Sequence, residues 1–146
     1  MLKIQKLITE AKIVGKIDLP HDNTPEGQIS KSDLKSLEKV LDALFKHAGI
    51  DIEFSKHMFD RVNDPRNKDQ ITIQELRSLF QKTYQKYKDR LKSLGPDAQA
   101  VLNDLQTDVN VPFILKWDSK NNELDLVSKT VMRKKNFMTS NPKLKV

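Results

Sequence analysis

The feature that most constrains this chain is a change of hydrophobic periodicity at Gly95-Pro96. Upstream, Thr72 and Glu75 have the spacing of a capping box, and apolar residues then recur with helical spacing to about Leu94. Downstream, apolar and polar residues alternate, as they do in strands that are buried on one face. A chain with helices first and strands afterwards is predicted to form an α+β fold.

Further elements are predicted on both sides of this long helix. Ser32 can cap an earlier helix that Gly49 ends. Residues 50–54 alternate as a short strand, and a brief helix is expected from Ser55 to Val62. The strands expected after the long helix span residues 99–105, 111–117 and 123–132. We therefore expect N-terminal helices followed by an antiparallel meander of about four strands.

The 146 residues suit one domain with an extension at each end. Residues 1–11 have the apolar stripe of an amphipathic helix, either a detachable leader or a helix docked on the domain. Residues 12–30 are rich in turn-forming residues and predict a linker arm. The single α+β domain is expected at 31–137, and a basic C-terminal tail at 138–146.

Composition argues against several kinds of site. The chain has no cysteine, which excludes disulfides, thiolate catalysis and cysteine-based zinc sites. Its three histidines, His21, His47 and His57, are too far apart in sequence to form a His-x-x-x-His metal pair. We therefore expect no metal and no cofactor. There is no run of about 18 apolar residues, so we expect no membrane span.

Positive charge is concentrated near the two ends of the chain. Residues 129–146 contain six lysines and arginines and no acidic residue, which equals the net charge of +6 of the whole chain. The first sixteen residues carry four lysines against Glu10 alone. Such segments attract phosphate backbones or acidic protein surfaces. A solvated terminus that aids solubility explains them equally well.

A candidate catalytic group begins at His57. Arg61 lies four residues later on the same face of the predicted helix, and Arg66 follows in a loop that can fold back. A histidine can move a proton near neutral pH, and arginines can stabilise the charge on a phosphorane, so the group suits RNA cleavage without a metal. In the alternative, His57 packs in the core or pairs with Asp60, and both arginines form ordinary ion pairs.

The order His57, Arg61, Arg66, an Ile-Thr segment and a helix resembles the small RNase-like folds of the barnase, colicin and RelE toxin group. The resemblance implies that His57 acts as general acid or base and that both arginines stabilise the phosphorane. Lys129 and Arg133 are four residues apart and would share one face of a strand. The residues implied to bind the flanking nucleic acid are Lys129, Arg133, Lys134 and Lys135.

Aromatic residues give little sign of a base-stacking platform. Phe113 and Trp117 share one face of a predicted strand with Leu115, and we assign them to the sheet core. Apart from Phe137, no aromatic residue interleaves with the basic residues near the C-terminus. A module specific for single-stranded nucleic acid is therefore weakly supported.

The N-terminal amphipathic segment contains Ile8-Thr9-Glu10, and the small residue Ala11 follows. This arrangement resembles the capsid-targeting leaders of proteins packaged in the heads of large tailed phages. Those leaders end in an aliphatic residue, any residue and Glu, after which a prohead protease cuts. The basic segment 129–137 is similar to small proteins of such phages. The resemblance implies processing between Glu10 and Ala11.

These features lead to one main hypothesis and two alternatives. The main hypothesis is a phage-encoded RNase-toxin-like domain that engages nucleic acid, in the virion or the host cytoplasm, with catalysis left open. The first alternative is a non-enzymatic virion protein that binds DNA, portal or capsid proteins. The second is a host-takeover factor that binds one host protein through residues 1–30.

Overall fold

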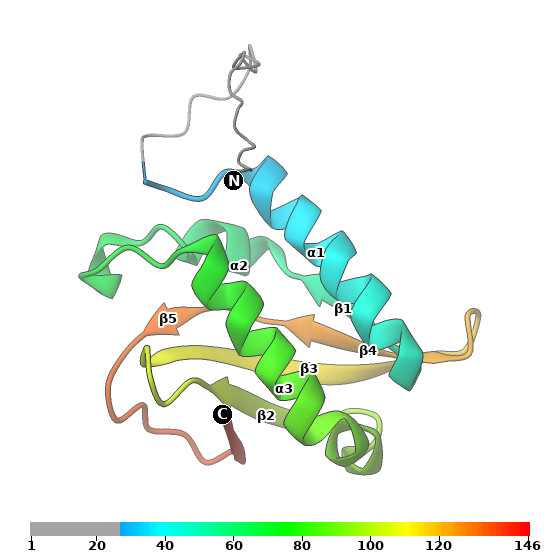
Figure 1. Cartoon of the computed structure of the whole chain (residues 1–146). Coiled ribbons are helices and arrows are strands. Elements are labelled where there is room, and N and C mark those ends of the chain that lie inside the picture. The colour runs from blue at the N-terminus through cyan, green and yellow to red at the C-terminus, as the bar shows by residue number, and fades with distance from the viewer. Residues whose placement is uncertain (1–26) are drawn as a thin grey trace.

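The computed structural model describes residues 27–146, which form one sheet with two long helices across one face (Figure 1). The helices are α1 (Lys31–Phe45), α2 (Lys56–Arg61) and α3 (Ile73–Leu94), with short 3-10 turns η1 (Lys46–Ala48) and η2 (Pro65–Asn67). The strands are β1 (Ile50–Phe54), β2 (Gln99–Asn103), β3 (Val109–Asp118), β4 (Glu123–Ser128), β5 (Met132–Arg133) and β6 (Lys143–Lys145).

The sheet is mixed rather than an antiparallel meander. Its strand order is β1-β4-β3-β2-β6, and the short β5 pairs with the start of β3. The central pairs are antiparallel, whereas β1 runs parallel to β4 and β6 runs parallel to β2. The α+β class is therefore confirmed. The expected four-stranded meander is wrong, because segments from both ends of the domain add parallel strands at the two edges.

Local capping groups start the helices, with one shift from the expected position. The Thr72 hydroxyl accepts the Glu75 N–H at 3.1 Å and the Glu75 carboxylate accepts the Thr72 N–H at 3.0 Å, which confirms the capping box of α3. The cap of α1 is Ser30 rather than the expected Ser32. Ser30 is favoured because Asp33, three residues later, completes a second capping box.

The core lies between the sheet and the two long helices. The strand register aligns Ile52, Leu126 and Leu115 in one row across β1, β4 and β3, and all three side chains are buried. Phe45 of α1 and Phe80 of α3 meet edge to face, with ring centroids 6.3 Å apart. The helices cover the sheet with the buried residues Leu34, Leu37, Leu41, Phe45, Leu76, Leu79, Phe80 and Leu91.

Carboxylates of α1 close the free edge of β1, the first strand of the sheet. The Ile52 N–H donates to Asp42 Oδ1 at 2.6 Å, and the Phe54 N–H donates to Glu38 Oε2 at 2.7 Å. Unpaired N–H groups on an edge strand would otherwise be open to pairing with another chain. Burial raises the pKa of the Asp42 carboxyl to about 7, helped by the charge of Asp51 and opposed by the Ile52 N–H.

Several segments differ from the expected pattern. The strand expected at 123–132 is interrupted, because β4 ends at Ser128 and pairing resumes only at β5. Residues 143–145, expected in the tail, form β6, and Leu144 is buried in the core. Trp117, which we expect in the sheet core, is instead 52% exposed near the end of β3.

The described chain starts inside the expected linker arm, 12–30. The last residues of this arm belong to the domain, because the backbone of buried Ile29 forms two hydrogen bonds with the Asn63 side chain, at 2.9 and 2.7 Å. The expected leader and its Glu10–Ala11 junction lie outside the described residues. Within 27–146, no helix has both the length and the apolar character needed to cross a membrane.

Candidate functional site

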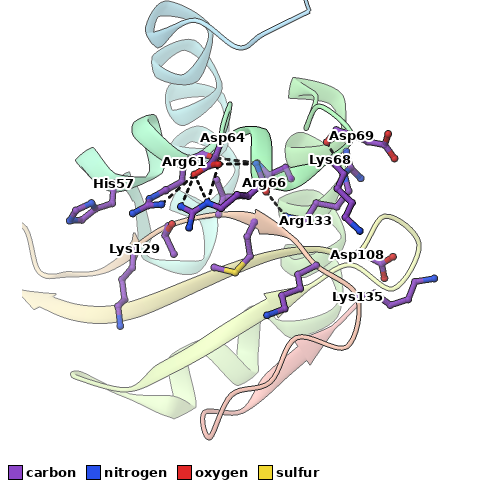
Figure 2. Close-up of a pocket in the computed structure, with 15 residues that line it drawn as sticks. His57, Arg61, Asp64, Arg66, Lys68, Asp69, Asp108, Lys129, Arg133 and Lys135 are labelled. Atoms are coloured by element: carbon purple, nitrogen blue, oxygen red, sulfur yellow. Dashed lines mark hydrogen bonds and ion pairs between the residues drawn. The ribbon is translucent and has the colours of Figure 1, made fainter.

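A groove of about 1070 Å³ lies where α2 and η2 face the segment that leaves β4 (Figure 2). One wall comes from α2, η2 and the loop that follows, between residues 57 and 69. The other wall comes from residues 129–135, and Asp108 also lines the groove. The groove brings together the seven predicted site residues that lie in the described chain: His57, Arg61, Arg66, Lys129, Arg133, Lys134 and Lys135.

The groove is strongly basic. Three aspartates line it, Asp64, Asp69 and Asp108. They are outnumbered by seven lysines and arginines, namely Arg61, Arg66, Lys68, Lys129, Arg133, Lys134 and Lys135. Because these cations come from both walls, an anion in the groove would be approached from two sides. Clefts lined mainly by one sign of charge raise the local concentration of the opposite ion.

Asp64 positions the two arginines of the first wall. Arg66 Nη2 lies 2.8 Å from Asp64 Oδ2, and Arg61 Nη1 lies 3.3 Å from the same oxygen. Asp64 Oδ1 also accepts the Arg66 backbone N–H at 2.9 Å, which caps η2. The side chains of Arg61 and Arg66 remain 45% and 74% exposed. One carboxylate therefore holds both guanidiniums while leaving them open to the groove.

Asn67 joins the two walls. Its side chain is buried; Nδ2 donates to the Arg61 carbonyl at 3.1 Å and Oδ1 accepts the Arg133 N–H at 2.9 Å. The next residue, Lys68, ends η2 with a φ of 63°, a conformation that non-glycine residues seldom adopt. The Asn67 side chain therefore connects the backbone of the first wall to that of the second.

Arg133 is a structural residue of the second wall. Its guanidinium donates to both carboxylate oxygens of Glu75, at 3.0 and 2.7 Å. The same guanidinium donates to the backbone carbonyls of Asp69, Gln70 and Thr107. Hydrogen bonding from Arg133 lowers the pKa of the Glu75 carboxyl below its ordinary value. These contacts do not favour the expected role of Arg133 as a phosphate ligand.

The expected common strand face of Lys129 and Arg133 is wrong. The two residues are separated by the interruption that follows Ser128, so the alternation of a continuous strand does not apply. Lys129 Nζ donates to Gln99 Oε1 on β2 at 2.8 Å, whereas Arg133 is bound to Glu75 at the start of α3. Figure 2 shows the Lys129 side chain directed away from the group around Asp64.

Lys134 and Lys135 are two exposed cations of the second wall. Within residues 27–146, neither ammonium group has a hydrogen-bond or ion-pair partner. The backbone of Lys134 is nevertheless fixed, since its N–H donates to the Asp108 carbonyl at 2.9 Å. Both lysines line the groove, and Figure 2 shows the Lys135 side chain at its Asp108 end.

His57 lies at one end of the groove, on α2, and is exposed. Figure 2 shows its ring directed away from Asp64, and no residue of the described chain hydrogen-bonds to it, Asp60 included. A general acid or base must reach the proton that it transfers, and it is commonly oriented by a further group. The groove therefore has the cations of an anion-binding site, but no other side chain among residues 27–146 orients its histidine for proton transfer.

A second cluster consists of three carboxylates of β1 and β4. They lie close enough to one another to share an ion. Asp51 of β1 and Glu123 and Asp125 of β4 place carboxylate oxygens within 4.8 Å of one another. Burial is the main cause that raises the pKa of the Asp125 carboxyl to about 6, and the negative charge of Asp51 is the second. This trio could not be predicted from the sequence, because the parallel pairing of β1 with β4 leaves no local signal. Clustered carboxylates alone do not identify a metal site.

Three further groove residues, Asp64, Asn67 and Lys68, could not be recognised as site residues from the sequence. Asp64 before Pro65 is a typical start of a capped turn, but its two arginine partners depend on how the loop folds. Lys68 is one of many lysines in the chain, and only the structure places it in the groove. No local pattern distinguishes buried Asn67 from an ordinary turn asparagine.

Comparisons with known proteins found no family model, no curated protein sequence and no solved structure that matches this chain. The resemblances to RNase-like folds and to phage proteins therefore stay predictions.

Proposed function

We propose that this protein binds nucleic acid through the groove between residues 57–69 and 129–135. The observation that carries the proposal is the set of seven lysines and arginines that line one open groove from two distant parts of the chain. Regularly spaced phosphates are the anions that a row of cations binds most effectively, because each neutralised phosphate releases counter-ions. Contacts of this kind supply affinity and orient the nucleic acid.

Three kinds of cation have different roles in this proposal. Lys68, Lys134 and Lys135 act as point charges that follow the phosphate backbone. Arg61 and Arg66 are positioned by Asp64, and a guanidinium has five N–H donors, so donors remain for a phosphate. Arg133 holds the second wall in place through Glu75.

The geometry favours binding over RNA cleavage. The ribonuclease hypothesis needs His57 to exchange a proton with RNA beside Arg61 and Arg66. His57 instead lies at the end of the groove without a partner among residues 27–146, and both arginines are engaged with Asp64. A DNA-binding virion protein would use the same groove, whereas a protein that binds portal, capsid or a host factor would not need it.

The proposal is tested by removing groove charge and comparing an equal loss of charge elsewhere. The groove variant is Lys134→Gln/Lys135→Gln. The control is Lys31→Gln/Lys39→Gln, which removes two exposed lysines from α1, outside the groove. The probe is a fluorescein-labelled duplex of about 20 base pairs, as DNA and as RNA, followed by anisotropy from about 50 to 200 mM KCl, the range in which phosphate contacts are most visible.

We expect the wild-type protein to bind with a steep salt dependence. The groove variant should lose about tenfold in affinity at low salt, and its slope of log K against log salt should fall by about 2. The control should stay within about twofold of the wild type, since net charge alone acts weakly at a distance in salt. Equal losses in both variants, or no binding by the wild type, would overturn the proposal.

A further inference from the structure

The groove lacks an aromatic platform. Among residues 27–146, those that line it include no Phe, Tyr or Trp. Other aromatic side chains are packed in or against the core: Phe45, Phe54, Phe59, Phe80, Tyr84, Tyr87 and Phe113. Proteins that bind single strands without sequence preference combine a basic groove with aromatic rings on which the bases stack. The groove has the first component and lacks the second.

Trp117 and Phe137 are the two remaining aromatics, and neither lines the groove. The start of β3, at Val109, pairs with Arg133 in the groove wall, whereas Trp117 lies eight residues further along this strand. At the rise of an extended strand, Trp117 lies about 26 Å along β3 from Val109, and about 17 Å from Pro112, whose carbonyl accepts the N–H of the groove-lining Lys129. Phe137 is half-buried, and its carbonyl accepts a hydrogen bond from Lys143 Nζ at 2.8 Å.

Most groups that could read base edges are held by partners within the protein. Arginine and asparagine are the side chains best suited to bidentate recognition of bases. Asn67 is buried and bonded to both walls, and Arg133 is bound to Glu75 and three carbonyls. Arg61 and Arg66 share Asp64. The cations left without a partner in the described chain are lysines, which bind phosphates as point charges.

We infer that the groove takes double-stranded nucleic acid, bound through its phosphates and without sequence readout. This inference rests on the proposed function and narrows its substrate class. A duplex presents two phosphate rows to the cations of the two walls and keeps its bases stacked on one another, so it needs no aromatic partner. A single strand would leave its bases exposed in a groove whose lining among the described residues has no Phe, Tyr or Trp on which they could stack.

The test compares strands of equal length on the full chain. The probes are two unrelated duplexes of about 20 base pairs, as DNA and as RNA, and a single-stranded oligothymidine of the same length, all at about 100 mM KCl, where unspecific contacts are moderated. We expect both duplex sequences to bind within about threefold of each other, and at least about tenfold more tightly than oligothymidine, as phosphate-driven binding requires.

Trp117 supplies an independent readout, because it is the only tryptophan of the chain. Its fluorescence should change little when a duplex binds, and Trp117→Ala and Phe137→Leu should bind like the wild type. Oligothymidine binding as tightly as the duplexes, or quenching of Trp117 with loss of affinity in Trp117→Ala, would overturn the duplex inference and leave the proposed function standing. A large preference for one duplex sequence would overturn the absence of sequence readout. If none of the probes binds, the proposed function itself fails.

Discussion

Arg133 and Glu75 form a two-pronged ion pair, with Nη1 to Oε2 at 3.0 Å and Nη2 to Oε1 at 2.7 Å. The same Glu75 Oε1 accepts the Thr72 N–H at 3.0 Å, so one carboxylate closes the capping box of α3 and also holds β5. The two side chains are only 16% and 24% exposed. The second wall of the groove is thereby attached to the first turn of the longest helix.

Arg133→Lys should destabilise the protein, because a lysine cannot make the paired hydrogen bonds to Glu75 or reach the surrounding carbonyls in the same geometry. We expect the free energy of unfolding to fall by about 2 kcal/mol, less than for a fully buried pair. Urea unfolding followed by circular dichroism measures this. The control Lys135→Met, at an exposed position with no partner in the described chain, should stay within about 0.5 kcal/mol of wild type. Equal stability of Arg133→Lys and the wild type would contradict a structural role.

His57→Ala separates binding from cleavage. The matched control is His47→Ala, since His47 is also exposed but lies on η1, outside the groove. We expect intact RNA after incubation with the wild-type protein, and duplex affinities within about twofold for both variants, because neither loses a phosphate-binding lysine. Gel analysis of labelled RNA and anisotropy measure the two outcomes. Cleavage by the wild type that persists in His47→Ala and disappears in His57→Ala would restore the ribonuclease hypothesis.

The edge of β1 should promote self-association when the carboxylates that accept its N–H groups are removed. Glu38→Ala/Asp42→Ala leaves the N–H groups of Ile52 and Phe54 without their acceptors, and open edge strands pair with other chains. We expect more self-association than in the wild type, measured by light scattering over a concentration series. Glu38→Gln/Asp42→Asn is the matched control, because the amide oxygens can still accept both hydrogen bonds. The explanation fails if both double variants behave alike.

Stability should decrease as the pH rises from about 4 to 7. The pKa of Asp42 is raised to about 7 and that of Asp125 to about 6, in both cases mainly by burial. Because these pKa values exceed the ordinary value for aspartate, the folded state binds more protons than the unfolded state in this window, and raising the pH removes that advantage. Glu75 has the opposite effect at lower pH, because Arg133 lowers its pKa. Its contribution to the free energy of unfolding is lost when the carboxylate is protonated in acid.

The measurement is the urea midpoint of unfolding at several pH values between about 4 and 8, the range over which these carboxyls titrate. Asp42→Asn should flatten the decline, since its amide keeps the acceptor for Ile52 and does not titrate. Asp60→Asn, at an exposed position on α2, serves as the control and should follow the wild-type curve. A wild-type midpoint that rises steadily from acid to neutral pH would show that the raised pKa values do not govern stability.

The sequence predicted the elements whose signals are local. The capping box of Thr72 and Glu75 and the Ser55 cap of α2 are confirmed, whereas Gly49, at a φ of 72°, ends the 3-10 turn η1 that follows α1. These features depend on hydrogen bonds within a few residues, so they can be recognised in a single chain. The cap of α1 was misplaced because Ser30 and Ser32 both have suitable chemistry, and only Ser30 completes a capping box with Asp33.

The arrangement of the sheet could not be predicted in the same way. Alternation identifies a strand at residues 50–54 but carries no information on its partner, and its parallel pairing with β4 joins segments far apart in the chain. Residues 143–145 are too short and too basic to be recognised as a strand, yet Leu144 is buried beside β2. Their pairing is decided by which arrangement covers the apolar face of the whole sheet.

The groove combines features that could be predicted from the sequence with others that depend on the tertiary structure. The sequence by itself determined that the segment 129–135 is basic and that the segment 57–66 carries His57, Arg61 and Arg66 on a short capped helix and the turn that follows it. Only the folded chain decided that the two segments face each other, that Arg133 belongs to Glu75, and that Lys129 turns to Gln99. The physical reason is that charge and capping are properties of neighbouring residues, whereas the partner of a long side chain depends on packing between distant elements.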